Sequence, residues 1–183
     1  MSDDTTAAPG ALRPPYRVEV TDRAADLQAA HAGLADGDNS GVSATVAGRV
    51  MLLRSMGKLA FATLRDSSGA VQLMATAKGT EGFDTFTSLS LGDWVVATGE
   101  VIRSRKGELS VQVKGWELLA EARRGFGDKW KGITDTDLRY RQRYADLWAN
   151  PESRDTFVLR SRVVSLMRRW LEDRGFIEVE TPL

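Results

Sequence analysis

Short runs of alternating apolar and polar residues fill the middle of the chain. From Val42 to Leu52, every second residue shares one face of an extended strand. Turn-forming residues separate this run from four others with strand-like patterns. The predicted strands are residues 42–53, 59–66, 70–75, 94–103 and 108–119. A less regular stretch, Gly79 to Leu91, lies between the third and fourth strands and is expected to hold a short helix.

This order of elements predicts a mainly β fold. Five strands with a helical insert between the third and fourth are the layout of an OB-fold barrel. Closing the barrel removes the exposed edges that such short strands would otherwise leave. Thr21 to Leu34 has helical spacing and precedes the barrel, with Thr21 as the expected cap. His31 is expected to be a helix-face residue and not a metal ligand, because no second ligand candidate lies near it.

Two further helices are expected after the barrel. The first starts at Thr134, with Asp137 in a capping-box position, and carries an apolar stripe that includes Tyr144. The second starts with Asn150 as its cap and Pro151 at its first position. Its apolar stripe is widened by neighbouring residues. The stripe comprises Phe157, Val163, Val164, Met167, Trp170 and Leu171.

The second of these helices has a clear predicted end. Gly175 is a good helix terminator. Phe176 to Thr181 then alternates apolar residues with Glu and predicts a strand that runs into Pro182.

Composition narrows the function classes. Apolar residues make up 42% of the 183 residues, and the 25 basic and 25 acidic residues balance. A protein that coats nucleic acid by bulk charge is therefore not expected, although a local basic patch remains possible. The chain has no Cys and one His, which excludes disulfides and argues against a zinc site. No apolar run reaches membrane-spanning length, and residues 1–18 are expected to be a disordered leader without signal-peptide features.

The candidate chemistry lies on the outer face of the predicted barrel. Small and aliphatic residues at Ala60, Ala62 and Leu64 suit the interior, which places Phe61 outside. The same alternation on the next strand places Gln72 outside. An exposed ring can stack on a base, and an amide can read a base edge. The alternative is that Phe61 packs beneath the flanking helix while Gln72 is simply solvated.

A basic run, Arg139 to Tyr144 (RYRQRY), offers a second candidate surface. Arginines interleaved with aromatics could grip RNA phosphates. The alternative is a solvated face that also packs two tyrosines onto a neighbouring domain, and it is the one we favour from the residues alone.

Three motifs carry a resemblance to one family. The barrel stretch Val46 to Leu73 (VAGRVMLLRSMGKLAFATLRDSSGAVQL) closely resembles the anticodon-binding domain of lysine-specific class II aminoacyl-tRNA synthetases. The RYRQRY run resembles the segment that joins barrel and catalytic domain in that family. Arg174 to Pro182 (RGFIEVETP) resembles motif 1, which builds the class II dimer interface.

The resemblance implies roles for particular residues. It places Phe61 as the ring that stacks on the central uridine of the anticodon and Gln72 as its hydrogen-bonding partner. Glu108, in the GELSV turn, would help to read another anticodon base. Arg54 matches a basic residue of the first loop. Many lysine enzymes have two adjacent basic residues there, whereas this chain has Leu53 before Arg54.

It also implies a dimer interface in motif 1, with Arg174, Gly175, Phe176 and Pro182 as its residues. No catalytic and no metal-binding residue is expected in this chain. Motifs 2 and 3, which bind ATP, Mg²⁺ and lysine, would lie beyond Leu183, so no cofactor is assigned here. The chain alone is expected to bind tRNA weakly and to catalyse nothing.

The complete enzyme is expected to be a cytoplasmic homodimer that charges lysine tRNA and does not involve a membrane. Two alternatives remain: a stand-alone OB-fold nucleic-acid-binding module, and a synthetase-like domain of a bifunctional protein that makes lysyl-lipid. The expected organisation is a leader (1–18), an N-terminal helix (19–41), the OB-fold domain (42–120), a linker with the basic helix (121–150) and the truncated start of a class II catalytic domain, with its first helix and strand (151–183).

Overall fold

The computed structural model describes residue 15, residues 17–123 and residues 132–182. The chain divides into two compact units, Met1–Gly125 and Phe126–Leu183, which we describe separately. Most of the predicted leader and part of the predicted linker lie outside the described residues.

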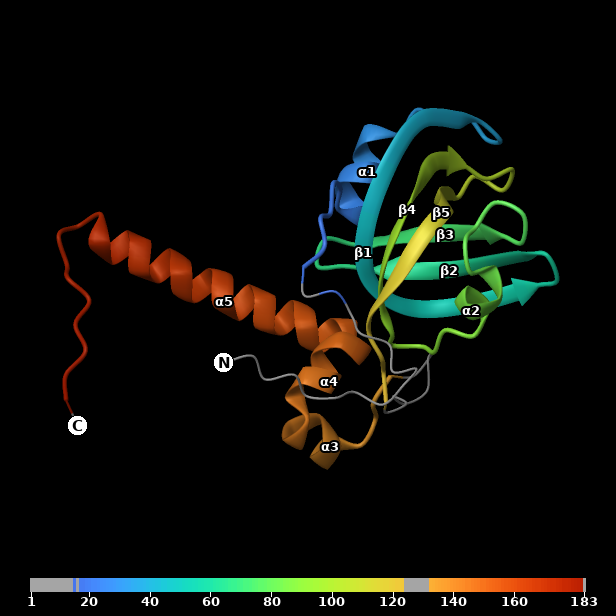
Figure 1. Ribbon diagram of the computed structural model, residues 1–183. Helices are drawn as coiled ribbons and strands as arrows, with labels where there is room; N and C mark the ends of the chain where they lie inside the picture. Colours follow the sequence, from blue (N-terminus) through green and yellow to red (C-terminus); the bar gives the residue numbers. More distant parts are fainter. Residues whose placement is uncertain (1–14, 16, 124–131, 183) are drawn as a thin grey trace, which may run out of the picture. The chain divides into compact units, whose positions relative to one another are not determined.

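The first unit is a closed five-stranded barrel (Figure 1). Its strands pair in the order β1-β2-β3-β5-β4, and β4 returns to pair with β1. All pairs are antiparallel except β3 with β5. The strands are β1 (Asn39–Met56), β2 (Leu59–Arg65), β3 (Ala70–Thr76), β4 (Trp94–Arg103) and β5 (Leu109–Ala120). The predicted OB-fold barrel is confirmed.

Strict alternation of burial explains why β2 and β3 form two of the five strands of the barrel wall. Every second residue of these strands is buried, and the residues between them are not. The buried positions are Ala60, Ala62, Leu64, Val71, Leu73 and Ala75. Small and aliphatic side chains fill a narrow barrel interior, so the inward and outward faces follow directly from the sequence pattern.

One extra residue in β1 changes the face of its second half. Val50 pairs with Leu64, but the next partner of β2 is Leu52, opposite Thr63. This bulge reverses the alternation. Leu53 therefore packs against the core, and the prediction that Leu52 shares the inward face is wrong. The prediction is also wrong for Val42, which is 48% exposed beside an irregularity at the start of the strand.

A short helix, α1 (Ala24–Ala30), packs Leu27 into the barrel core. Its N-terminus is capped from the barrel. The Asp66 carboxylate accepts a hydrogen bond from the Ala24 N–H at 2.8 Å, and the Ser68 hydroxyl accepts one from Ala25 at 3.0 Å. Thr21, the cap predicted from local sequence, instead bonds Thr45 of β1. The prediction failed because the capping groups lie more than 40 residues away along the chain.

We expect Asp66→Ala to lower the free energy of unfolding by about 1–2 kcal/mol, because it uncaps α1 and loosens the β2–β3 turn. Burial alone would raise the pKa of Asp66, but hydrogen bonds from Ala24, Ser68 and Gly69 outweigh it and lower the pKa. The carboxylate therefore contributes stability above its unfolded pKa of about 3.9 and loses it as the pH falls. Urea unfolding should show that the difference in free energy of unfolding between Asp66→Ala and wild type becomes smaller below about pH 4.

The matched control is Asp38→Ala, which removes an exposed carboxylate just before β1. Equal destabilisation by the two substitutions would show that general charge, and not the cap, accounts for the effect.

The predicted insert between the third and fourth strands contains α2 (Phe83–Thr87). Phe86 is fully buried and meets the ring of Trp116 edge to face, with centroids 5.4 Å apart. This contact ties the insert to β5.

The second unit contains three helices, α3 (Thr136–Arg141), α4 (Arg143–Ala149) and α5 (Pro151–Glu172). The sequence predicted one helix starting at Thr134, and that prediction is wrong in two respects. Asp135 is the cap, and its carboxylate accepts from the Leu138 N–H at 2.9 Å. Gln142 leaves the helical conformation, with φ −116° and ψ 60°, and divides the segment in two.

The start and end of α5 follow the sequence prediction. Asn150 stands at the cap position and Pro151 opens the helix, although the Asn150 side chain makes no capping bond. At the other end, Gly175 has φ +81°, a conformation that glycine adopts without strain. Its N–H bonds Glu172 O while the Phe176 N–H bonds Leu171 O, which is the Schellman pattern.

The predicted strand from Phe176 to Thr181 is not observed. These residues carry no strand assignment. Alternation favours a strand only where a partner supplies the ladder, and the described part of the chain supplies none.

Candidate nucleic-acid interface

A row of outward-facing side chains crosses four strands of the barrel. Arg54 of β1 lies opposite Phe61 of β2, and Phe61 lies opposite Met74 of β3. Met74 in turn lies opposite Gln112 of β5. Arg54 is exposed and Phe61 is half-buried. The β1 bulge creates this row, because without it Arg54 would share the parity of the core.

A second row lies next to the first on the same face. Thr63 of β2 pairs with Gln72 of β3, and Gln72 pairs with Ser110 of β5. Gln72 is thus a diagonal neighbour of Phe61, at a spacing that long and aromatic side chains can bridge. The structure therefore places the two residues as their strand parity predicts. Helix α1 is anchored at the other end of this hairpin, where Gln28 donates to Ala70 O.

Glu108 lies in the β4–β5 turn, two residues before Ser110, which pairs with Gln72. Its side chain is exposed. Its backbone N–H and carbonyl both lie within hydrogen-bond distance of serine hydroxyls. The Glu108 N–H donates to the Ser104 hydroxyl at 3.0 Å, and its carbonyl lies 3.2 Å from the Ser110 hydroxyl. The structure thus places Arg54, Phe61 and Gln72 on one outer face of the barrel, and Glu108 is exposed two residues before Ser110, the cross-strand partner of Gln72. We call these four residues the outer-face cluster.

Arg103 holds the turn that carries Glu108. Its guanidinium donates to Gly107 O at 2.8 Å and to the carbonyls of His31 and Ala32, just beyond the end of α1, at 3.0 and 3.3 Å. One cation therefore fixes the turn against α1 and satisfies carbonyls beyond the helix end. Sequence reasoning missed this residue, because its partners beyond α1 lie 72 and 71 residues away along the chain.

The basic run in the second unit is organised around a buried carboxylate. Asp146 is fully buried. Arg139 donates to it at 2.8 Å and Arg143 at 2.6 Å. Burial alone would raise the pKa of Asp146, but hydrogen bonds from Asn150, Arg139, Ser153 and Arg143 lower it to about 2. Two arginines of the run are thus committed to holding the helices together.

The tyrosines of this run behave differently. Tyr140 is 72% exposed and Tyr144 is 67% exposed. The Arg143 guanidinium lies 4.7 Å from the centre of the Tyr140 ring. Within the described residues they are therefore surface side chains.

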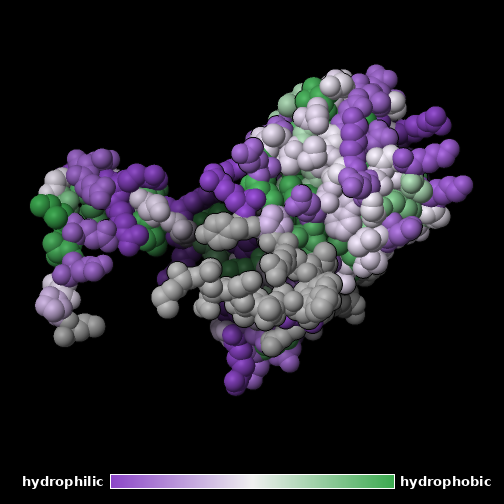
Figure 2. All heavy atoms as spheres, viewed as in Figure 1, coloured by the Kyte–Doolittle hydropathy of each residue, from purple (hydrophilic) through white to green (hydrophobic). Residues whose placement is uncertain are grey.

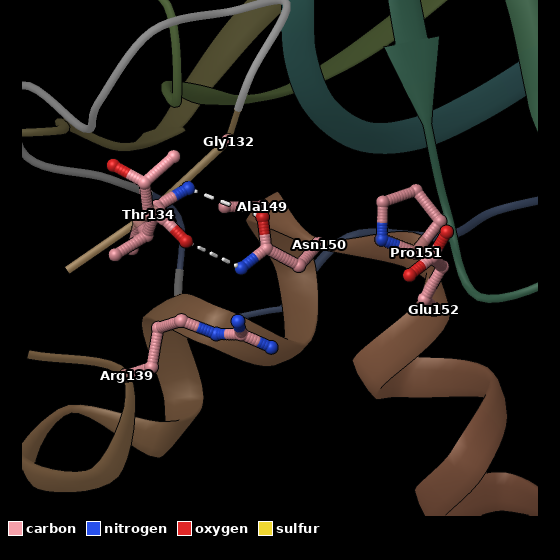
Figure 3. Close-up of a pocket in the computed structure, with 8 residues that line it drawn as sticks. Gly132, Thr134, Arg139, Ala149, Asn150, Pro151 and Glu152 are labelled. Carbon is pink, nitrogen blue, oxygen red and sulfur yellow. Dashed lines mark hydrogen bonds between the residues drawn. The ribbon is translucent and has the colours of Figure 1, made fainter. Parts of the chain in front are cut away.

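Asn150 closes a loop beside this network (Figure 3). Its amide donates to Ile133 O at 2.9 Å and accepts from the Ile133 N–H at 3.1 Å. Gly132 allows this approach, since a Cβ there would lie 1.9 Å from the Asn150 oxygen. The residues border a pocket of about 530 Å³ whose lining includes Arg139 and Glu152. The Arg139 guanidinium is already bonded to Asp146 and Ser153.

The predicted interface residues of the C-terminal segment are all at the surface. Phe176 is 62% exposed, and Pro182 is exposed as well. Arg174 stacks over the Trp170 ring at 3.7 Å and donates to Trp170 O. Figure 2 shows apolar side chains, drawn in green, at the surface of this end of the chain.

No residue of α5 is buried. Its apolar stripe therefore lies open along the helix. Exposed apolar residues of α5 are Phe157, Val158, Leu159, Val163, Val164, Leu166, Met167, Trp170 and Leu171. In the segments that the structure describes, no helix is both long and apolar enough to cross a membrane.

Comparisons with known families match both units. Residues 44–119 match the OB-fold nucleic acid binding domain family, and residues 135–183 match the class II tRNA synthetases (D, K and N). The first match covers the barrel and its outer-face cluster, while the second covers α3 to the C-terminal segment.

Two relatives with similar sequences illustrate the match at the level of individual proteins. A lysine–tRNA ligase of Prochlorococcus marinus (strain MIT 9303) is 47% identical over 182 residues, which cover 92% of this chain and 36% of the relative. A lysine–tRNA ligase of Synechococcus sp. (strain RCC307) is 47% identical over 173 residues, covering 92% and 34%. The chain spans about a third of the length of these relatives.

Proposed function

The chain belongs to the lysine–tRNA ligase family of class II aminoacyl-tRNA synthetases, and we propose that its barrel binds the anticodon of lysine tRNA. The outer-face cluster carries this proposal: an aromatic ring, an amide and a cation share one outer face of an OB-fold, and an exposed carboxylate lies in the β4–β5 turn. Single-stranded RNA is recognised by stacking of splayed bases and by hydrogen bonds to their edges.

Each residue of the cluster has a proposed role. Phe61 stacks on the central uridine, and Gln72 hydrogen-bonds its edge. Glu108 reads a second anticodon base, and Arg54 contacts RNA phosphate or base. Phe61 is half-exposed, and Arg54 and Glu108 are exposed. These exposures support the proposed roles, because all three residues are accessible to a ligand.

The complete enzyme is proposed to activate lysine with ATP and Mg²⁺, to transfer it to tRNA and to act in the cytoplasm. Among the described residues, no three His, Asp or Glu side chains converge as a metal site would need. The predicted domain bounds, with the anticodon-binding domain at 42–120 and the catalytic domain starting at 151, are kept as part of this proposal.

We further propose that the complete enzyme is a homodimer that uses the C-terminal segment. The open apolar stripe of α5 supports this, because contiguous apolar surface of this kind marks interaction sites. Arg174, Gly175, Phe176 and Pro182 are the proposed interface residues at its end.

A stand-alone OB-fold module would account for the barrel alone. It would leave unexplained the match of residues 135–183 to class II tRNA synthetases. We therefore favour the synthetase.

The proposal predicts discrimination between anticodons. Fluorescence anisotropy at fixed salt would compare two labelled anticodon stem–loops that differ only in the three anticodon bases, one of them with the lysine anticodon. We expect the lysine loop to bind at least about tenfold more tightly, because each well-placed edge contact contributes about 1–3 kcal/mol. Equal affinities would contradict anticodon recognition and indicate binding to the RNA backbone alone.

A further inference from the structure

We propose that Ser110 is a positioning residue that fixes the orientation of the Gln72 amide and so decides which base the outer-face cluster accepts. The inference rests on the proposed anticodon-binding function. It adds a residue that touches no ligand itself, because the Ser110 side chain shares the outward face with Gln72 but is fully buried there.

The geometry that carries the inference is one short hydrogen bond. The Ser110 hydroxyl donates to Oε1 of Gln72 at 2.9 Å. The hydroxyl has a single proton, and its other acceptor, the Glu108 carbonyl, lies further away at 3.2 Å. The pairing of β3 with β5 holds the two residues in register, opposite each other. The contact is therefore built into the barrel wall.

This contact distinguishes the two ends of the Gln72 amide, because Oε1 is bonded to Ser110 and Nε2 is not. Rotating the amide by half a turn would place the Nε2 donor against the Ser110 oxygen. That oxygen could accept from Nε2 only if the hydroxyl proton turned to the Glu108 carbonyl, which lies further away at 3.2 Å and already accepts from the Ser104 N–H. With Oε1 engaged, Nε2 is the end left to face a ligand, and no described residue accepts a hydrogen bond from it. Gln72 then presents a donor and requires an acceptor on the base edge.

A donor at this position separates the two pyrimidines. Uracil offers the O4 carbonyl as an acceptor, whereas cytosine carries the N4 amino group, a donor, at the same place. Two donors that face each other leave both unpaired, which costs affinity in a partly desolvated site. Ser110 thus sets a preference for a keto pyrimidine under the stacking ring of Phe61.

The same hydroxyl also links Gln72 to Glu108. Ser110 lies between the Gln72 side chain and the Glu108 carbonyl, so two residues of the cluster share one buried group. Removing it frees the amide to rotate and relaxes the start of β5 on the same side.

The test compares two anticodon stem–loops that differ only in the central base, uracil or cytosine. We expect the wild-type chain to prefer uracil by about tenfold and Ser110→Ala to reduce this ratio to about twofold, because the freed amide can turn Oε1 towards cytosine. The ratio is the informative readout, since a merely structural role for Ser110 would weaken both loops equally. Ser43→Ala, an exposed serine of β1, is the matched control and should keep the wild-type ratio.

Three results are distinguishable. A wild-type chain that does not discriminate between the lysine loop and a changed anticodon overturns the proposed function and this inference with it. A discriminating wild type whose ratio survives in Ser110→Ala overturns the inference alone. A double variant, Gln72→Ala with Ser110→Ala, should show the ratio of Gln72→Ala alone, because Ser110 acts through Gln72. A further change in the double variant also overturns the inference.

Discussion

Phe61→Ala is expected to weaken binding of the lysine anticodon stem–loop by about 5- to 150-fold. The range corresponds to the loss of one base–aromatic stack, about 1–3 kcal/mol. The Phe61 side chain is half-buried on the outer face and is not among the apolar side chains packed on the barrel core. Its removal should therefore reduce affinity with little change in stability. Anisotropy titration with the labelled loop measures the first effect, and urea unfolding measures the second.

Two companion variants separate stacking from general apolar contact. Phe61→Tyr keeps the ring and is expected to bind within a few-fold of wild type, while Phe61→Leu keeps apolar volume without the ring and is expected to resemble alanine. Met74, the cross-strand neighbour of Phe61, provides a position control through Met74→Ala. Unchanged affinity in Phe61→Ala would show that the ring does not meet RNA. An equal loss of affinity for the loop in Phe61→Leu and Phe61→Tyr would indicate disturbed packing instead of a lost stack.

Much of the barrel could be predicted from the sequence because its rules are local. Alternation alone assigned the inward residues of β2 and β3, and it placed Phe61 and Gln72 on the same outer face. The same rule failed in β1, where one extra residue at the bulge reverses the faces of Leu52 and Leu53. No glycine or proline marks the shift between Val50 and Leu52, so periodicity cannot locate it.

The features that sequence reasoning missed depend on contacts between distant segments. Asp66 caps α1 across 42 residues, and Ser110 meets Gln72 across 38. Such partners become neighbours only when the barrel closes. The arginines of the basic run posed a related problem. Their pattern suggested exposed charge, either as the solvated face that we favoured or as a surface for RNA phosphates, whereas a buried Asp146 engages both Arg139 and Arg143.

From Phe176 to Thr181 the alternation of the sequence predicts a strand that the structure does not contain. A strand pattern states what a segment can do when a neighbouring strand is available. Within the described residues no strand pairs with it. Pattern and structure therefore differ here because pairing is a property of the surroundings.

Asp146→Asn is expected to have the largest effect on the stability of the second unit, about 2–3 kcal/mol. The substitution keeps the shape of the side chain but leaves Arg139 and Arg143 without a counter-charge, and loss of one partner of a buried ion pair typically costs 3–5 kcal/mol. The arginine side chains are 38% and 32% exposed and can regain water, which reduces the expected cost. The Asn150 amide and the Ser153 hydroxyl also lose a charged acceptor.

Hydrogen exchange resolved along the chain is the suitable measurement, because the two units need not unfold together. Amides of α4 and the first turns of α5 should exchange about 30- to 150-fold faster in Asp146→Asn, while those of the barrel stay unchanged. Asp137→Asn removes an exposed carboxylate from the first turn of α3 and is the matched control. Wild-type protection around α4 in Asp146→Asn would show that the buried charge does not stabilise these helices.

The pH dependence provides an independent check with a defined sign. The pKa of Asp146 is lowered to about 2 in the folded chain, whereas an unfolded Asp titrates at about 3.9. A lowered pKa means that the folded state favours the ionised carboxylate, so its contribution is fully present above about pH 4 and is lost progressively as the pH falls towards 2. After correction for intrinsic exchange, protection of α4 in the wild type should therefore fall across this window, and Asp146→Asn should lack this component of the decline. A parallel decline in both proteins would place the acid-sensitive group elsewhere.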